Sequence, residues 1–392
     1  MQRFSQNIDC RFDDGEHISA RIIAQQSETP ALAETLPPEA YHSASFYQIE
    51  MEKVLRHDWL FLGHIAQIPE ENDYFTLDVA GEPLLVTRSA GDVKVLSNVC
   101  LHRWVPIAQG SGNAKIFVCP FHNWSYNPQG KLVGAPSMQQ AEKFVAHDCR
   151  LPEIRHEIVA GMIFATFSAT VESLSERLAP LMPVLEKYHL SRLSLAYTHD
   201  YQCPFNWKMA VETFMECYHH AGIHRGSLEG SFPGRLSRTG ESGPGWTICH
   251  QPLRKNGEQS EICVEGLIPF EGLDEDDYRR IDLLLIYPNC LISLNPDRVT
   301  ISAILPRQPQ MTDWHRLVLV SDASAAQDSF AQTAATMKSN SLPIIEEDQF
   351  INTLQQRGSL SALARPGRLS HLETTVWHFS NFLRTKLAEK TE

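Results

Sequence analysis

The chain has 392 residues, of which 43% are hydrophobic and 21% are charged, so it resembles an ordinary globular protein with one very large core or two smaller ones. Its formal net charge of −13 argues against nucleic acid or an anionic membrane as the main partner. The charge would suit docking to a basic protein, and a solvated acidic surface explains it equally.

The N-terminus and the cysteines predict a cytoplasmic protein. Residues 1–17 carry acids and contain no apolar core, so they do not predict a signal peptide. No apolar run approaches the roughly 18 residues that a membrane-spanning helix needs. The nine cysteines are scattered and odd in number, which indicates reduced thiols, some of them candidate metal ligands, rather than a disulfide framework.

The first two segments of the chain differ in hydrophobic pattern. Residues 1–59 are predicted to form a proline-marked arm and a helix that packs on the C-terminal domain, with Ser45 and Gln48 as a capping box. From Phe75 the hydrophobic period changes to two, and turn signals separate short apolar runs. Residues 60–165 are therefore expected to form a small all-β domain.

Residues 166–392 are expected to form a second domain of the α+β class. A helical, proline-punctuated connector precedes a predicted strand and helix, and residues 226–280 are rich in Gly, Ser and charge, which suggests a long loop or lid. Strands are predicted between residues 281 and 321, followed by helices at about 343–357 and around Val376. This order predicts an antiparallel sheet with long helices.

Two Cys/His pairs lie at predicted strand ends in the β domain. Cys100 and His102 form the first pair, and Cys119 and His122 form the second. A [2Fe–2S] centre of the Rieske kind needs two thiolates on one iron and two imidazoles on the other, which these pairs could supply. A zinc site is the competing metal, although zinc fingers usually bring paired cysteines followed by paired histidines. Buried, hydrogen-bonded side chains without a metal are the structural alternative.

A second group of candidate ligands lies in residues 206–224, which are predicted to form one helix. Helical spacing pairs His220 with His224, and Glu212 and Glu216 precede them. Two histidines and one carboxylate are the ligand set of non-haem Fe(II) oxygenases. A zinc hydrolase with His220, His224 and a glutamate base is an alternative that leaves the Cys/His pairs unexplained.

The Cys/His stretches resemble the Rieske motif of the Rieske non-haem iron oxygenases, terminal oxygenase subunit. The family patterns are CxHRG and CPYHGWxYxxxG, and the corresponding stretches here are CLHR and CPFHNWSYNPQG. Trp104 and Asn123 stand at the two glycine positions, while all four ligands are present. This resemblance implies a Rieske [2Fe–2S] cluster on Cys100, His102, Cys119 and His122.

The iron motif of the same family, ExYHxxxxH, maps onto Glu216, Tyr218, His219 and His224. The resemblance thus selects His219 over His220, and a five-residue separation on one helix would need a distortion such as a π-bulge. The segment 346–358, EEDQFINTLQQRG, resembles the stretch whose aspartate completes the triad, which implies Asp348 as the third ligand of a mononuclear Fe(II). Acids also cluster in the first turn of a helix without a metal, which leaves Glu346 and Glu347 as alternatives.

The resemblance also implies the partners and the assembly. Electrons from NAD(P)H would reach the cluster only through a separate flavin/iron–sulfur reductase, with or without a ferredoxin, and the iron would activate O2 in a helix-grip catalytic domain. The enzyme would be a homotrimer in which Glu216 bridges His219 and the partner subunit's His122, and so links cluster and iron. Thr213 replaces the asparagine of the family's ENF run.

Three further stretches are similar to the family branch that acts on small quaternary ammonium compounds, such as the glycine betaine and carnitine monooxygenases. They are ECYH, YPNCLISLNPD (287–297) and PGRLSHLE (366–373). The expected reaction is hydroxylation of an N-methyl group leading to N-demethylation, and the alternative is dihydroxylation of an aromatic ring. A non-catalytic Rieske electron carrier would leave the second domain without a role.

Overall fold

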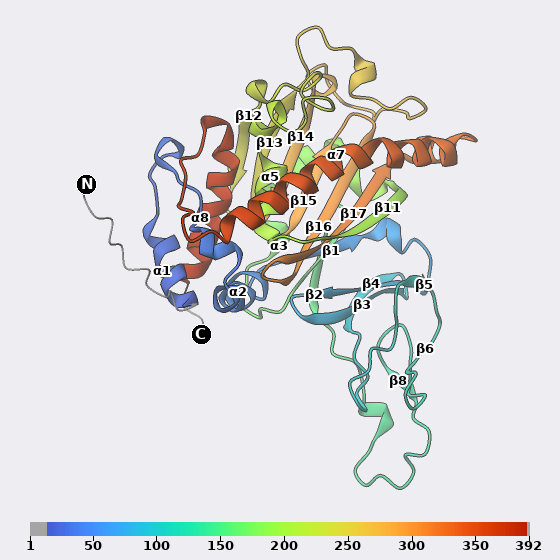
Figure 1. The fold of residues 1–392 in the computed structure, drawn as a ribbon. Helices are drawn as coiled ribbons and strands as arrows, with labels where there is room; N and C mark the ends of the chain where they lie inside the picture. Colours follow the sequence, from blue (N-terminus) through green and yellow to red (C-terminus); the bar gives the residue numbers. More distant parts are fainter. Residues whose placement is uncertain (1–13, 390–392) are drawn as a thin grey trace.

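Apolar strands between positions 194 and 320 build the largest element of the molecule, a seven-stranded antiparallel sheet. The computed structural model describes residues 14–389, and Figure 1 shows this sheet in the upper lobe. Its strand order is β11-β17-β16-β15-β14-β13-β12. The strands are β11 (Ser194–Cys203), β12 (Arg238–Gly243), β13 (Trp246–Pro252), β14 (Arg280–Ile286), β15 (Cys290–Leu294), β16 (Arg298–Gln308) and β17 (Met311–Val320).

The edge hairpin β12–β13 lies within residues 226–280, which the sequence predicted to be a long loop or lid. That prediction was wrong for the hairpin. Its second strand buries Trp246, Ile248 and Cys249 in the sheet, but the glycines and charges of the first strand hide the alternation. The following residues 253–279 do form irregular chain with two short 3₁₀ turns, Gln259–Glu261 and Asp277–Arg279.

The two faces of the sheet belong to different hydrophobic cores. One face, with Leu284 and Ile292, packs toward the strands β1 and β10 and the short helices of the connector. The other face, with Leu283 and Leu291, packs beneath the helices α5 and α8. The long helix α7 crosses this second face (Figure 1) and contacts α5 and β11. Candidate ligands on α5 and α7 therefore meet over one face of the sheet.

The helix α7 is longer than the sequence predicted. It runs from Phe330 to Ser359, whereas the predicted helix began at residue 343. Pro343 lies inside α7, and because proline favours the first turn of a helix, the prediction placed the start there. The other helices are α1 (Gly15–Ala24), α2 (Ala44–Glu50) with a π-helical turn (Met51–Leu55), α3 (Leu174–Arg177), α4 (Met182–Lys187), α5 (Trp207–Met215), α6 (Asp322–Ala325) and α8 (Thr374–Ala388).

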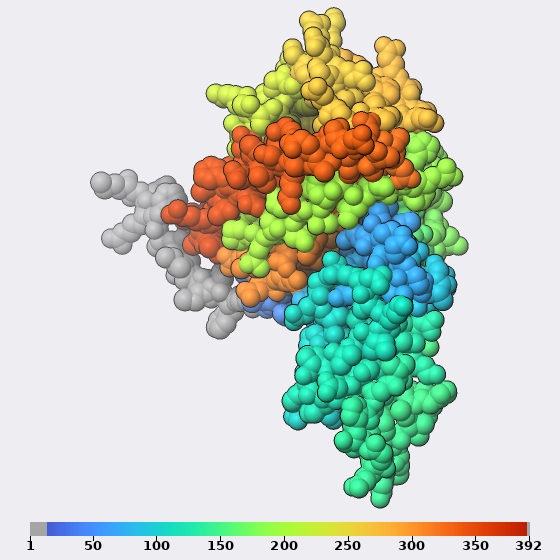
Figure 2. All heavy atoms as spheres, turned by 90° about the vertical axis from the view of Figure 1, so that its right-hand side faces the viewer, coloured from blue at the N-terminus to red at the C-terminus, as the bar shows by residue number. Residues whose placement is uncertain are grey.

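The β domain forms the lower lobe, which projects from the body of the molecule (Figures 1 and 2). It contains a four-stranded sheet of order β4-β3-β2-β5 and two three-stranded sheets, β6-β7-β8 and β1-β10-β9. Its strands are β1 (Leu60–His64), β2 (Asp73–Val79), β3 (Glu82–Ser89), β4 (Asp92–Ser97), β5 (Ser111–Asn113), β6 (Phe117–Val118), β7 (Ser125–Tyr126), β8 (Leu132–Gly134), β9 (Arg155–Val159) and β10 (Met162–Thr166).

The N-terminal helix α1 packs against α2 and α8, and the buried Ile22 and Phe46 of α1 and α2 join the core that contains Phe379. The cap of α2 is Ser43, whose hydroxyl accepts from the Phe46 N–H at 2.9 Å, so the predicted cap at Ser45 was two residues late. The prediction of no signal peptide concerns mainly residues 1–13, which lie outside the described residues.

An all-β domain followed by an antiparallel sheet with long helices confirms the predicted fold class. Between residues 14 and 389, none of the helices has the length and apolar character that a membrane crossing requires.

Candidate metal centres

The histidine-rich stretch after α5 is not one helix with a bulge, as the sequence predicted. The helix α5 ends at Met215, and Glu216 is extended, with φ −129° and ψ 152°. A short 3₁₀ turn, Tyr218–Ala221, then carries His219, and His224 follows it. The break at Glu216 turns the chain so that residues five positions apart can face one point, without a π-bulge.

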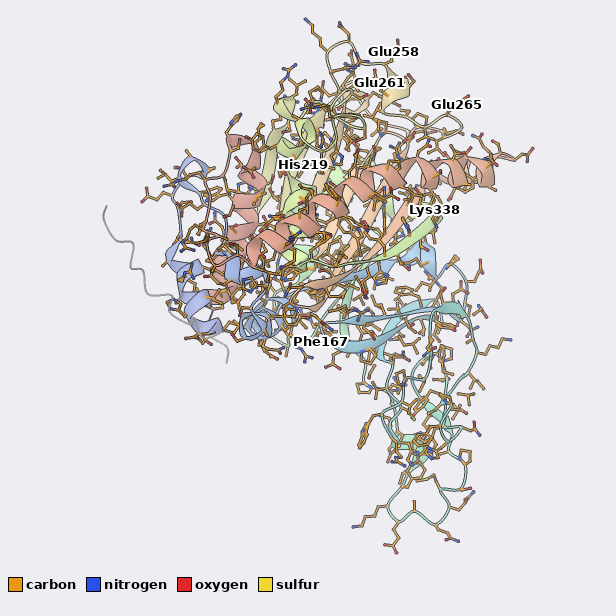
Figure 3. The ribbon with its side chains drawn as sticks, in the orientation of Figure 1. Phe167, His219, Glu258, Glu261, Glu265 and Lys338 are labelled. Atoms are coloured by element: carbon orange, nitrogen blue, oxygen red, sulfur yellow. The ribbon has the colours of Figure 1, made fainter. Side chains whose placement is uncertain are left out.

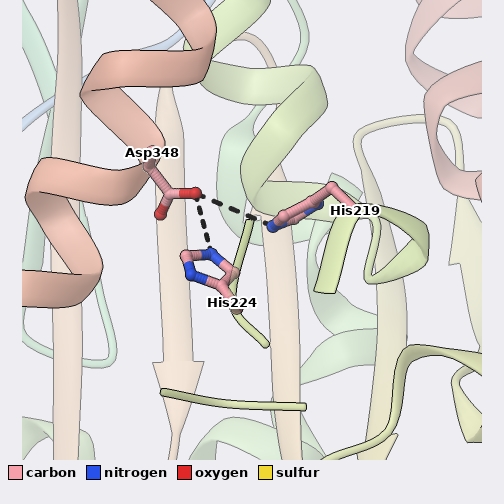
Figure 4. A group of neighbouring side chains, drawn as sticks. All are labelled: His219, His224 and Asp348. Atoms are coloured by element: carbon pink, nitrogen blue, oxygen red, sulfur yellow. Dashed lines mark hydrogen bonds and ion pairs between the residues drawn. The ribbon is translucent and has the colours of Figure 1, made fainter. Parts of the chain in front are cut away.

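The structure brings His219, His224 and Asp348 together (Figure 4). Asp348 lies in α7, and its Oδ1 is 3.0 Å from His224 Nε2 and 3.7 Å from His219 Nε2. One ligand atom from each residue lies within 4.8 Å of the others. Two imidazoles and one carboxylate that converge from one side suit a metal with open positions on the other side.

Glu347 supports this group from behind. Its Oε2 lies 2.7 Å from His224 Nδ1 and accepts from the Ser227 hydroxyl at 2.6 Å. Burial alone would lower the pKa of His224, but the hydrogen bonds and charges of Asp348 and Glu347 outweigh it and raise this pKa. Sequence reasoning missed the roles of Glu347 and Ser227, because only the packing of α7 shows that adjacent acids contact opposite edges of one imidazole. Glu346 is exposed.

His220, which helical spacing paired with His224, uses its ring nitrogens elsewhere. Its Nδ1 lies 2.9 Å from the Phe232 carbonyl oxygen, and its Nε2 lies 3.4 Å from Gln251 Nε2. Burial lowers the pKa of His220 to about 4. A neutral His220 therefore anchors the loop to the sheet, and it is not one of the residues that converge on Asp348.

Glu216 contacts His219 twice. Its Oε1 lies 2.6 Å from His219 Nδ1, and its Oε2 accepts from the His219 backbone N–H at 3.1 Å. This arrangement orients the ring so that Nε2 faces Asp348, as carboxylates behind metal-binding histidines commonly do. The predicted bridge to the partner subunit's His122 stays a prediction.

The two Cys/His loops of the β domain share one backbone design. In the first loop the Cys100 carbonyl accepts from the Trp104 N–H at 3.0 Å, and in the second the Cys119 carbonyl accepts from the Asn123 N–H at 3.0 Å. Trp104 and Asn123 have positive φ values of 61° and 58°. Glycine adopts this left-handed conformation without strain, which explains why the motif prefers it there. Both departures from the motif therefore keep its loop geometry.

The four residues of these loops fit a Rieske cluster. Nδ1 of His102 and Nδ1 of His122 lie 3.2 Å apart, so both rings aim at one point. Both cysteines are buried, and the Tyr126 hydroxyl lies 3.3 Å from Cys100 Sγ. Trp124 stacks on the His102 ring with centroids 4.9 Å apart. Two convergent imidazoles, two buried thiols and a hydrogen bond to sulfur are what such a cluster requires.

Two family models match the chain. A model described as "Ring hydroxylating alpha subunit (catalytic domain)" matches residues 190–389, and one described as "Rieske [2Fe-2S] domain" matches residues 58–149. The chain belongs to the Rieske non-haem iron oxygenases. The domains of this family hold a [2Fe–2S] cluster and a mononuclear iron, which confirms the predicted cofactors. These two matches argue against the zinc-hydrolase alternative. The match to the catalytic domain also argues against a simple electron carrier.

Curated relatives include both monooxygenases and dioxygenases. Putrescine 2-hydroxylase of Ralstonia nicotianae is 29% identical over 283 residues, or 71% of this chain and 74% of the relative. The carnitine monooxygenase oxygenase subunit of Escherichia coli is 29% identical over 60% of this chain and 64% of the relative. Biphenyl 2,3-dioxygenase subunit alpha of Rhodococcus jostii is 31% identical over 48% of this chain and 42% of the relative. The chain thus spans less than two thirds of several relatives.

Solved structures share the fold of this Rieske oxygenase. A quaternary ammonium Rieske monooxygenase has a TM-score of 0.78 at 21% identity, covering 91% of this chain and 96% of that one. Naphthalene 1,2-dioxygenase from Rhodococcus sp. also reaches 0.78, at 18% identity, covering 97% of this chain and 100% of that one. At such identities the similarity shows the fold alone, and this fold is common to the monooxygenase and the dioxygenase.

Proposed function

We propose that this Rieske oxygenase is the terminal component of a system that uses O2 and electrons from a separate reductase to hydroxylate a small organic substrate. The observation that carries the proposal is the convergence of His219, His224 and Asp348 beneath α7. Iron held by two histidines and one carboxylate keeps open positions, and it supplies the chemistry of oxygen activation. The Asp348 side chain is 32% accessible, so the group is reachable from outside.

The residues around the triad hold its ligands in position. Glu347, fixed by the Ser227 hydroxyl, accepts from Nδ1 of His224 and leaves Nε2 free to bind the metal. Glu216 does the same for His219. Each carboxylate selects one tautomer of its imidazole and increases the basicity of the nitrogen that faces the metal.

We further propose that electrons pass between subunits of a homotrimer. In one chain the Cys/His loops belong to the projecting lower lobe, whereas the triad lies beneath α7 in the upper lobe (Figure 1). Around the loops, Leu101, Trp104 and Phe121 are 38%, 79% and 52% exposed, an apolar surface suited to docking. The partner subunit's His122 would then approach Glu216, and NAD(P)H would act only through the reductase, with or without a ferredoxin.

The substrate class that we propose is a small quaternary ammonium or N-methylated compound, hydroxylated at an N-methyl group. Carnitine and glycine betaine monooxygenase subunits support this choice, with 29% identity over 60% and 48% of the chain. Dihydroxylation of an aromatic ring is the second candidate, because biphenyl 2,3-dioxygenase subunit alpha is 31% identical over 48% of the chain.

Replacement of Asp348 by alanine tests the proposal. Iron content should fall by about one atom per chain and substrate-dependent oxygen consumption should stop, while the visible spectrum of the cluster stays unchanged. Glu346→Ala, in the same turn but exposed, is the matched control and should keep iron and turnover. Loss of the cluster spectrum in Asp348→Ala would contradict the site. Parallel assays of oxygen uptake with N-methylated amines and aromatic compounds distinguish the two substrate classes.

A further inference from the structure

A row of three polar side chains crosses the large sheet. His199 of β11 lies directly opposite Arg316 of β17, which in turn lies opposite Ser302 of β16. The next row, two residues along each strand, is Tyr201, Trp314 and Ile304, which belong to the core beneath α5. Because strand residues two apart share a face, the polar row lies on the face that α7 crosses.

These three side chains lack partners where partners are expected. Among residues 14–389, the half-buried Arg316 guanidinium forms no hydrogen bond or ion pair, and the hydroxyl of Ser302, which is 2% exposed, forms no hydrogen bond. Nδ1 of His199 and Nε1 of the neighbouring Trp314 are buried without partners. Buried polar groups are nearly always satisfied, so the unpartnered nitrogens of His199 and Trp314, beside a guanidinium and a hydroxyl that form no hydrogen bond within residues 14–389, favour a ligand at this row.

The charge around the row is positive. Lys338 of α7 donates to the Thr198 carbonyl oxygen at 3.2 Å, which places its ammonium group beside β11. Burial, followed by the charges of Lys338 and Arg316, lowers the pKa of His199. The nearest acid on the strand is Asp200. As the residue next to His199, it points to the opposite face of the sheet, where it pairs with His315 at 3.1 Å. The row thus offers donors and positive charge without a carboxylate of its own.

The row and the proposed iron site lie on the same side of the large sheet, beneath α7. Burial raises the pKa of Tyr201, the charge of Arg316 lowers it and the charge of Asp348 raises it, so this phenol lies within electrostatic reach of both residues. His199 precedes Tyr201 by two residues, or about 7 Å along a strand. Lys338 and Asp348 are separated by about 15 Å along α7. The row, which lies beside Lys338, and the triad, which contains Asp348, therefore lie beneath the same helix.

The acids on the outer loop provide a contrast. Glu258, Glu261 and Glu265 lie beyond α7 on the loop between β13 and β14 (Figure 3). The carboxylate of Glu261 already binds Arg254 at 2.8 Å and the Ser231 hydroxyl at 2.5 Å. The row of His199, Arg316 and Ser302 carries cationic and neutral donors and no carboxylate, which suits an anion rather than a diamine.

We propose that Arg316, with His199 and Ser302, binds a carboxylate of the substrate and so determines specificity. The inference rests on the proposed function and names its substrate class, a small acid such as an N-methylated amino acid or an aromatic acid. The planar guanidinium can donate two parallel hydrogen bonds to one carboxylate, a geometry that lysine does not offer. Ser302 and the His199 ring add donors on either side of it.

The test is calorimetric binding to the oxidised holoenzyme, without turnover. The probes are a panel of N-methylated amino acids and aromatic acids, each paired with its carboxamide. At least one acid should bind the wild type, and its amide should bind roughly 10- to 100-fold more weakly. Arg316→Gln should abolish this preference, and Arg316→Lys should keep only part of it. Arg192→Gln, an exposed charge on a surface turn, is the matched control and should bind as the wild type does.

The proposal is overturned if no acid in the panel binds better than its amide, or if the preference survives in Arg316→Gln. An unchanged cluster spectrum and iron content show that the variants fold. Asp348→Ala should still prefer the acid while losing turnover. A wild type that binds the acid but consumes no oxygen would therefore contradict the proposed function and leave the carboxylate site standing.

Discussion

The two metal centres of this Rieske oxygenase are built in different ways. The four predicted cluster ligands lie between residues 100 and 122, on two loops closed by the same pair of backbone hydrogen bonds. The triad joins a loop after α5 to a residue of α7 that is 124 positions away from His224. Local backbone geometry therefore defines the cluster site, whereas the iron site depends on how α7 packs on α5. Substitutions should perturb one centre without the other.

The largest effect is expected from Cys119→Ser. The variant should lose the cluster spectrum, about two iron atoms per chain and all reductase-dependent turnover, because a serine oxygen is a poor replacement for a cluster thiolate. Iron at the triad should remain, as measured by metal analysis. Cys149→Ser, a half-buried cysteine of the same domain, serves as the control and should keep the cluster. Loss of iron from the cluster and the triad together would show that the centres are not independent.

Glu216→Gln examines the link between the centres. Glutamine keeps the size of the side chain, so both metal centres should be retained in protein loaded with excess iron, although the weaker contact with Nδ1 of His219 should lower iron affinity as in Glu347→Gln. Electron transfer to the iron should slow by about 10- to 100-fold in single-turnover experiments on the prereduced protein. Unchanged single-turnover rates would refute the bridge.

Glu347→Gln should weaken only the iron site. Glutamine keeps the size of the side chain but weakens the contact with Nδ1 of His224, so iron affinity should fall by roughly 10- to 100-fold in a chelator competition. The cluster spectrum should not change. The neighbouring Glu346→Gln should match the wild type because Glu346 is exposed. Equal losses in both variants would mean that the charge of the helix, and not this contact, stabilises the site.

The smallest effect concerns the packing of α7 on α5. The Thr213 hydroxyl donates to Asn352 Oδ1 at 2.6 Å, one turn of α7 beyond Asp348. Thr213→Val leaves this buried amide unsatisfied and should reduce the free energy of unfolding of the catalytic domain by about 1–2 kcal/mol. Denaturant unfolding followed by tryptophan fluorescence measures it, and Thr353→Val, on the exposed side of α7, should cost at most about 0.5 kcal/mol. An equal loss in the two variants would contradict the role of this contact.

Much of the fold follows from local patterns. The strands between residues 281 and 321 are short apolar runs, and the Cys/His pairs occur at strand ends, so both were predictable. The errors have physical causes. Pro343 lies inside α7, although proline is typical of a helix start. The glycines of β12 interrupt the strand pattern, so the hairpin was not predicted. The single helix predicted over 206–224 failed because Glu216 is extended, with its carboxylate bonded to the ring and backbone of His219.

The sequence by itself determined the residue types of both metal centres and the sheet that carries the second, because ligand spacing within a loop and an apolar run within a strand are local properties. The motif resemblance selected His219 over His220, and the physical reason lies in the tertiary structure, where a backbone break and the docking of α7 turn His219 toward Asp348. It also decided that Arg316 stands between His199 and Ser302, because cross-strand register brings together residues that are far apart in the chain.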